Sequence, residues 1–268
     1  MHPFPILLDG IASGAVGLLA GGGPGTALRL GVAMLALQAS IGALNDVVDA
    51  PTDAGRKPGK PIPAGLVAPA LARVVTIGAA GVGIVLAAAS GPGPALLAGV
   101  VLAIGYGYDL AAKGTAWSWL PFAVGIPLLP VFGWYGAVAR LPAPFAVLLP
   151  TAVMAGAALA IANALADAQR DRDAAVGSVA IRLGERRAWA IGAVLQAAVG
   201  VVAIGSAWAA GAAALLLAAI ALSAGLVLAG VALGRSQSPT LLERAWEVQA
   251  VGTAVLAVGW LWAMAGPG

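Results

Sequence analysis

Long apolar runs separated by short polar stretches make up most of the sequence. A helix that spans a bilayer needs about 20 mostly apolar residues. Nine runs come close to that length: 5–21, 27–49, 66–89, 94–110, 117–138, 143–166, 187–208, 210–232 and 244–265. The runs are continuous rather than alternating in polarity, which argues against a transmembrane barrel of strands. The pattern therefore predicts an all-α, polytopic membrane protein with about nine transmembrane helices.

The composition agrees with a membrane protein and excludes several other classes. Of 268 residues, 61% are hydrophobic and 9% are charged, with a mean hydropathy of +0.97, whereas soluble domains carry roughly 25% charged residues. The chain has no cysteine, so a disulfide framework and thiol chemistry are excluded. The net charge of +3 does not indicate a nucleic-acid partner, because the basic residues lie beside the apolar runs. The sequence identifies no protein partner.

The charged residues are distributed unequally between the two sides of the predicted membrane. With nine spans, twelve Lys and Arg residues fall on one side, and only Arg29 and Arg140 fall on the other. Basic residues concentrate on the cytoplasmic side of membrane proteins. All eleven acids, from Asp9 to Glu247, also fall on or near this side, and no acid is expected in the middle of a span. We therefore expect a site that opens toward the cytoplasm.

The second apolar run ends in a cluster of carboxylates. Asn45 and Asp46 are followed by Asp49 and Asp53, and the i, i+3, i+7 spacing places the three acids on one face if the helix persists. Pro51 is expected to loosen or end the helix before Asp53, so that this acid reaches back from the loop. Three acids on one apolar face need cations to neutralise them. The stretch predicts a divalent-metal site at a membrane boundary.

The sixth apolar run ends in a similar way. Asn163, Asp167 and Asp171 follow one another at i, i+4 and i+8, again on one helical face. Each acid-bearing end is followed by a long basic loop, 50–65 and 167–186, and long ordered loops are more often functional than merely connecting. We expect both loops to cap the site. The pattern also suggests an internal duplication, in which runs two and three correspond to runs six and seven.

The donor types indicate which ligand these two ends hold. Sets of oxygen ligands without His or Cys suit hard cations such as Mg²⁺, which takes one or two carboxylates and completes its shell with water and phosphate oxygens. Neighbouring Lys and Arg side chains then bind the remaining phosphate oxygens. The implied ligand is a diphosphate, and in a membrane its natural form is an isoprenoid diphosphate whose chain lies between apolar helices.

At this point the sequence resembles the UbiA superfamily of intramembrane prenyltransferases. Asn45-Asp46-x-x-Asp49-x-x-x-Asp53 matches the family signature NDxxDxxxD, and Asp167-x-x-x-Asp171 matches its second motif, DxxxD. Three further segments resemble the family's basic loop, the segment after the second motif and the tyrosine-lysine stretch: 56–65, 178–184 and 108–113. The resemblance covers nearly the whole chain.

The resemblance implies a fold, a reaction and a cofactor. It implies one transmembrane domain over residues 1–268, with a central cavity that opens to the cytoplasmic side of a bacterial or archaeal-type cell membrane. Two Mg²⁺ ions would bridge the aspartates and a prenyl diphosphate. The prenyl group would be transferred to an aromatic or other polar acceptor in quinone or related lipid biosynthesis.

The resemblance also implies roles for individual residues. Asp46, Asp49, Asp53, Asp167 and Asp171 would hold Mg²⁺ directly or through water. Asn45 would support the first group and Asn163 would orient Asp167. Lys113 would be the leading contact to the pyrophosphate, and Tyr108 and Asp109 would touch the reacting centre or the acceptor. The secondary candidates for pyrophosphate binding are basic residues of the loops: Arg56, Lys57, Lys60, Arg172 and Arg182.

Simpler roles compete with each of these assignments. The first acid cluster could be a solvated helix end balanced by Arg56 and Lys57, and the second could form salt bridges with Arg170 and Arg172. Asp173 lies off the acid face, where we expect it to balance one of these arginines. Lys113 and the loop arginines could be topology anchors, and Tyr108 an interfacial aromatic.

Two other functions compete with prenyl transfer. A membrane terpene cyclase would use the same site without an acceptor, and a lipid-anion transporter would release no pyrophosphate. The confinement of acids to one side argues against a transporter. Family members that prenylate hydroxybenzoates commonly carry Arg-Pro near the first helix, where this sequence has His2-Pro3. This difference argues against a benzoate acceptor.

Overall fold

The computed structural model describes residues 3–54 and 59–265, and every regular element in these ranges is helical. The elements in order are α1 (Pro3–Leu19), α2 (Gly23–Asp53), α3 (Pro69–Ala88), α4 (Pro92–Gly107), the π-helical turn η1 (Tyr108–Ala112), α5 (Leu120–Val138), α6 (Phe145–Asp173), α7 (Val179–Leu183), α8 (Glu185–Ala209), α9 (Ala214–Leu233) and α10 (Pro239–Ala265). Within the described ranges, eight helices are long and apolar enough to cross a membrane, and α1 is a shorter apolar helix. The prediction of an all-α polytopic membrane protein is confirmed.

The end of α2 differs from the sequence-based expectation. The helix continues through Pro51 to Asp53, so the prediction that Asp53 lies in a loop is wrong. A proline inside a helix removes one N–H donor, but Pro51 is two residues from the end and few bonds depend on it. The Thr52 hydroxyl also donates to the Asp49 carbonyl at 2.9 Å, which supplies a local bond in the same turn. The three acids therefore belong to one continuous helix.

The described chain divides into two compact units. The first comprises residues 1–111 and 128–140, and the second comprises residues 112–127 and 141–268, so α5 contributes to both. The single domain expected over residues 1–268 stays a prediction.

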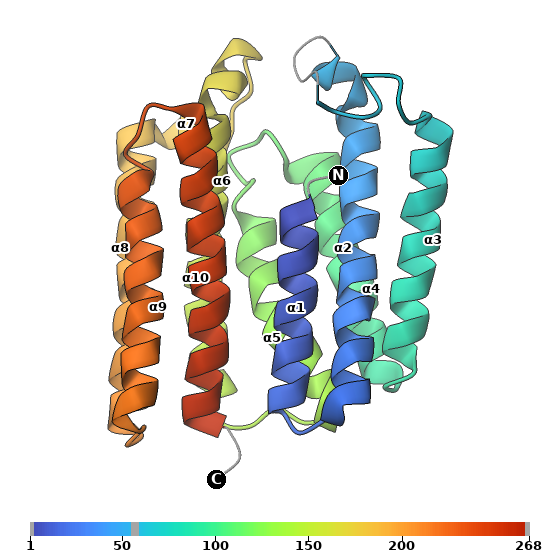
Figure 1. The fold of residues 1–268 in the computed structure, drawn as a ribbon. Helices are drawn as coiled ribbons and strands as arrows, with labels where there is room; N and C mark the ends of the chain where they lie inside the picture. Colours follow the sequence, from blue (N-terminus) through green and yellow to red (C-terminus); the bar gives the residue numbers. More distant parts are fainter. Residues whose placement is uncertain (1–2, 55–58, 266–268) are drawn as a thin grey trace. The chain divides into compact units, whose positions relative to one another are not determined.

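The first unit is built on close packing of small residues. In α1, Gly10 and Gly14 lie against Gly31 and Ala27 of α2, where a Cβ on Gly10 or on Gly14 would lie 3.1 Å from a backbone carbonyl oxygen. Small residues let helix backbones approach closely in lipid, where no hydrophobic force drives helices together. Figure 1 shows α1 and α2 side by side, with α2 extending beyond the N-terminal end of α1. A core of large side chains, among them Leu30 and Phe132, fills the remaining space of this unit.

The second unit packs α6 to α10 in a similar manner. Gly252 of α10 faces Val227 of α9, where an added Cβ would lie 2.8 Å from a side-chain methyl. The short helix α7, which the apolar pattern did not predict, packs Val179 and Ala180 against Ile161 and neighbouring residues of α6. In Figure 1, α7 lies at the end of this unit where α6 finishes. The segment after the second acid cluster is thus held against the helix that carries it.

One acid lies far from the helix ends. Asp9 is in α1, and its carboxylate accepts a hydrogen bond of 2.7 Å from Gln38 Nε2. Gln38 is near the middle of α2, fifteen residues before Asp53, or roughly 22 Å along the helix axis. Asp9 thus lies inside the apolar helix α1, and whether it lies in the middle of a membrane span stays untested.

Candidate active site

The end of α2 carries three carboxylates on one side of the helix. Because α2 is continuous to Asp53, Asp46, Asp49 and Asp53 lie within about 60° of one another around the helix axis. Asp46 and Asp53 are each 6% exposed, and Asp49 is half-buried. Carboxylates with so little access to water are costly to keep charged unless a cation faces them. We therefore expect a cation to face the acid side of α2.

A lysine from the following loop supplies positive charge at this face. Lys60 Nζ lies 2.6 Å from Asp46 Oδ1. Backbone hydrogen bonds within the loop, from Ala64 N–H to the Lys60 carbonyl at 3.1 Å and from Leu66 N–H to the Pro61 carbonyl at 2.9 Å, fold the segment that presents the lysine. Of the basic residues predicted from this loop, Lys60 is the one that the structure places at the acids. Arg56 and Lys57, like His2, lie outside the described residues.

A polar ladder links α2 to the turn after α4. The Ser40 hydroxyl donates its one hydrogen to the Thr76 carbonyl of α3 at 2.6 Å. In the 2.7 Å contact between Ser40 and Tyr106, Ser40 Oγ is therefore the acceptor and the Tyr106 hydroxyl is the donor. One turn further along, Asn45 Nδ2 donates to Asp109 Oδ1 at 2.7 Å. Asp109 is 6% exposed and belongs to η1, and such π-helical turns are frequent at functional sites. The ladder brings Asn45 and Asp109 together, and Tyr108 precedes Asp109 as a half-buried side chain.

The end of α6 presents its acids differently. Asn163, Asp167 and Asp171 lie on one face and are all half-buried. Asp167 forms an ion pair with Arg170, one turn along the same helix. Gln169 Nε2 donates to Asp173 at 3.0 Å, so Asp173 is held by an amide, and the expectation that it balances an arginine is not met in the contacts seen.

The chain after α6 is folded back and anchored. Val176 N–H donates to the Asp171 carbonyl at 2.8 Å and Ala175 N–H to the Arg172 carbonyl at 3.1 Å, while Ala175 has a φ of 55°. This combination closes the helix in the manner of a left-handed cap. The loop then meets the segment that follows η1, because a Cβ on Gly114 would lie 3.0 Å from Val176 Cγ1. The structure thus places the segment of Lys113 beside the loop after the second acid cluster.

Two arginines of this region face partners other than the acids of α6. Arg172 forms an ion pair with Glu185 of α8 and donates to Gln169. Arg182 is exposed, and its guanidinium lies near Gly177, where an added Cβ would be 3.0 Å from Nε. Neither contact tests a role in binding pyrophosphate, and both assignments stay predictions.

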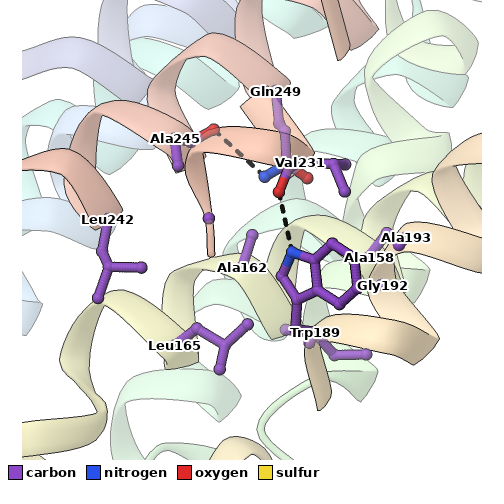
Figure 2. A pocket seen from close by; sticks show the side chains of 12 residues that line it. Ala158, Ala162, Leu165, Trp189, Gly192, Ala193, Val231, Leu242, Ala245 and Gln249 are labelled. Atoms are coloured by element: carbon purple, nitrogen blue, oxygen red, sulfur yellow. Dashed lines mark hydrogen bonds between the residues drawn. The ribbon is translucent and has the colours of Figure 1, made fainter. Parts of the chain in front are cut away.

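A small pocket in the second unit is separate from these acids. It encloses about 320 Å³ of space, its open mouth included. Figure 2 shows Trp189 donating to the Val231 carbonyl, at 2.9 Å, and Gln249 donating to the Ala245 carbonyl, at 3.2 Å. The α6 residues of its wall, such as Leu165, lie on the side of α6 opposite to Asp167 by the 100° helical step. Its mostly apolar lining does not suit a diphosphate.

Comparison with known proteins identifies the family. The model of the UbiA prenyltransferase family matches residues 10–249 of the chain. The chain belongs to this family. It is accordingly a membrane prenyltransferase, as the two aspartate motifs predicted.

Solved structures support the fold of this UbiA-family chain. A UbiA homolog from Aeropyrum pernix K1 is 20% identical with a TM-score of 0.75, and the match covers 96% of this chain and 98% of that one. A UbiA homolog from Archaeoglobus fulgidus, solved with GPP and Mg²⁺, is 17% identical with a TM-score of 0.69, covering 94% and 96%. A structure described for digeranylgeranylglyceryl phosphate synthase in membranes is 15% identical with a TM-score of 0.71, covering 97% and 96%. No curated protein gives a significant match.

The donor set of the UbiA-family chain fits a hard divalent cation. In the part of the chain that is described, no three His, Cys, Asp or Glu side chains gather closely enough to hold an ion by themselves. Mg²⁺ normally takes one or two carboxylates, water and phosphate oxygens, so it does not need such a cage. Asp46 already pairs with one cation, the Lys60 ammonium. This pairing agrees with a carboxylate that faces positive charge.

Sequence reasoning missed several partners of the site. The ladder residues Ser40 and Tyr106, the Arg172 partner Glu185, and the pair Asp9 and Gln38 were not singled out as such. A signal existed for the last two, because Asp9 is the one acid inside the first apolar run, and Gln38 is the one amide in the second run before Asn45. No comparable signal marks Tyr106 or Glu185, whose meaning depends on which helices pack together.

Proposed function

We propose that this enzyme transfers a prenyl group from an isoprenoid diphosphate to an aromatic or other polar acceptor, in quinone or related lipid biosynthesis, with two Mg²⁺ ions. The observation that carries the proposal is the end of α2, where Lys60 meets Asp46 at 2.6 Å beside two further acids on one helix face. Lys60 pairs with a buried carboxylate, and this lysine could turn to phosphate oxygens when metal ions bind the acids.

The bond changes are simple. The allylic carbon–oxygen bond breaks, its electron pair leaves with the pyrophosphate, and the prenyl carbon becomes a cation. The acceptor then donates an electron pair to form the new bond and loses a proton. Mg²⁺, when bound, neutralises charge on the leaving pyrophosphate.

The residues of this chain divide that work. Two groups of aspartates would hold the metal–diphosphate group: Asp46, Asp49 and Asp53 of α2, and Asp167 and Asp171 of α6. Lys60 and Lys113 would bind pyrophosphate oxygens directly. Asn45 would fix Asp109 in the orientation that its 2.7 Å hydrogen bond gives, and Asn163 would orient Asp167. The joint action of the two acid groups is supported by their matched motifs and by the family.

Four basic residues and one tyrosine would take supporting roles in the site. Arg56, Lys57, Arg172 and Arg182 would add positive charge around the pyrophosphate, and Tyr108 would border the reacting carbon. We propose further that the site faces the cytoplasm of a bacterial or archaeal-type cell membrane, because twelve of the fourteen Lys and Arg residues fall on the side of the aspartate motifs.

The test uses purified full-length protein with geranylgeranyl diphosphate, Mg²⁺ and a panel of phenolic and glycerol-lipid acceptors, with pyrophosphate release as the readout. The expected result is release that requires both Mg²⁺ and an acceptor, together with a prenylated product. A cyclic hydrocarbon formed without acceptor would instead establish the cyclase. Absence of pyrophosphate release from every donor and acceptor combination would overturn the proposal.

A further inference from the structure

Asp9 is an acid inside an apolar helix, and the proposed reaction gives it no role. It lies in α1 and hydrogen-bonds Gln38 of α2 at 2.7 Å. No Lys or Arg of the described residues forms an ion pair with it. An acid within a membrane span is costly and usually marks a functional position. Its neighbours therefore need to be considered one by one.

Asp9 lies on the inner side of α1. The exposed apolar side chains of this helix, Leu7, Ile11 and Leu18, form one stripe, within about 40° of one another. Asp9 lies roughly 160° or more from that stripe. It shares its side with Val16 and Ser13, which pack on Gly133 of α5. The carboxylate is therefore turned away from the surface that suits lipid.

Gln38 lies in line with the acid end of α2. It precedes Asn45 by seven residues and Asp49 by eleven, which places it within about 20° of both around the axis of α2. The distance from Gln38 to Asn45 along the axis is about 10 Å. In Figure 1, α2 extends past the N-terminal end of α1, and the acid end of α2 lies in this extension. The polar pair and the carboxylates thus occupy one continuous side of the helix.

The free atoms of the pair define what it binds. The hydrogen bond uses Asp9 Oδ2 and Gln38 Nε2, which leaves Asp9 Oδ1 and Gln38 Oε1, both hydrogen-bond acceptors. Both side chains are half-buried. The two acceptor oxygens suit a hydroxyl donor, whereas a carboxylate or phosphate has no hydrogen to give them.

We propose that Asp9 and Gln38 form a subsite that binds a hydroxyl group of a neutral acceptor and disfavours an anionic one. The inference rests on the proposed prenyl transfer and adds to it the class of acceptor. The separation of about 10 Å from Asn45 along the axis matches the length of an acceptor that has a ring or a glycerol unit between its hydroxyl and its reacting atom. Asp9 and Gln38 are specificity-determining residues in this arrangement and do not touch the diphosphate.

The test uses two matched pairs of acceptors that differ in charge. Hydroquinone is compared with 4-hydroxybenzoate, and 1-oleoylglycerol with its 3-phosphate, each with geranylgeranyl diphosphate and Mg²⁺. Asp9→Asn removes the charge while its amide can still bond Gln38, so a purely structural link between α1 and α2 is kept. Gln38→Leu removes the other half of the subsite. Ser13→Ala, one turn along the same side of α1, is the matched control.

The expected result is that the wild-type enzyme prefers a neutral acceptor over its anionic counterpart. In Asp9→Asn, the KM for the neutral acceptor rises about tenfold, the size of one charge-assisted hydrogen bond, and the preference over the anion shrinks, while the KM for geranylgeranyl diphosphate is unchanged. Gln38→Leu raises the same acceptor KM, and Ser13→Ala behaves as wild type.

Three outcomes would overturn the subsite. The first is an Asp9→Asn enzyme with the wild-type ratio of neutral to anionic acceptor. The second is an equal rise in the KM of donor and acceptor, which indicates a general structural effect. The third is a wild-type enzyme that releases pyrophosphate but uses or binds no neutral acceptor. Failure of the proposed function looks different, because no pyrophosphate is then released from any combination.

Discussion

The acid-bearing ends of α2 and α6 carry the same residue types at similar spacing, yet they hold their carboxylates in different ways. At α2, Asp46 is 6% exposed and takes its cation, Lys60, from the following loop. At α6, the Asp167 side chain is 35% exposed and pairs with Arg170 of the same helix, which is 59% exposed. Exposed pairs one turn apart contribute little and exchange easily with water. Buried acids facing a cation from another element are far more costly to disturb.

This difference indicates a division of labour between the two ends. The α2 end is fixed by packing, by Lys60 and by the hydrogen bond between Asn45 and Asp109. The acids of the α6 end are more exposed to water, and Asp167 pairs with the exposed Arg170. We infer that the first end positions the metal–diphosphate group and that the second completes its shell.

The largest effect is expected from Asp46→Asn. The substitution leaves Lys60 without its buried carboxylate and removes one proposed metal ligand from the end of α2. Loss of a preorganised electrostatic group costs on the order of 100- to 1,000-fold in kcat, and we expect the upper part of this range for pyrophosphate release. The matched control is Asp173→Asn, the same acid-to-amide change off the acid face of α6, which should stay near wild type. Comparable losses in both variants would contradict a special role of the α2 face.

Asp171→Asn is expected to have a smaller effect, on the order of 100-fold, because a half-exposed ligand can be replaced in part by water. The loss should be partly recovered at high Mg²⁺, since the variant binds the ion more weakly, whereas Asp46→Asn should recover less. The measurement is the Mg²⁺ dependence of the initial rate in both variants. If the two curves coincide, the ends of α2 and α6 are equivalent and the proposed division fails.

Lys60→Gln is expected to raise the KM for geranylgeranyl diphosphate about tenfold, as one charged hydrogen bond to phosphate is lost. Lys60→Arg should retain most of the affinity, because the positive charge is kept. Arg244→Gln provides a control in which an exposed cation on α10, paired with Glu247 at 2.6 Å, is removed. A Lys60→Gln enzyme with wild-type KM would show that this lysine serves only to neutralise Asp46.

Much of the fold followed from the sequence because lipid imposes one strong rule. Backbone groups in a membrane must bond within their own helix, so apolar length predicted the long helices, although not the short α7, and the motif spacing predicted the acid faces. Asp53 was misplaced since proline was taken to end α2, although a proline two residues from a helix end disturbs little. Tyr106, Glu185 and the pair of Asp9 with Gln38 could not be placed, because their partners depend on which helices are neighbours.

Arg170→Gln is expected to have the smallest effect of the series, within about threefold in rate, because exposed i, i+3 pairs contribute little. Removing the arginine frees Asp167 from a competing cation, so Mg²⁺ should bind somewhat more tightly at low concentration. Arg172→Gln is the informative partner variant. Its guanidinium ties α6 to Glu185 of α8 and therefore holds the loop after the second acid cluster.

The two arginines thus separate two explanations of the α6 end. If Arg172→Gln lowers kcat more than Arg170→Gln and leaves the KM for geranylgeranyl diphosphate unchanged, the loop must be anchored for the site to work, and the Asp167 pair is incidental. A rise in that KM would instead indicate the proposed role of Arg172 in binding pyrophosphate. If Arg170→Gln causes the larger loss at saturating Mg²⁺, Asp167 acts as part of an ion pair and not as a metal ligand. The ends of α2 and α6 would then differ in function as well as in burial, because Asp46 would still be expected to exchange Lys60 for a metal ion.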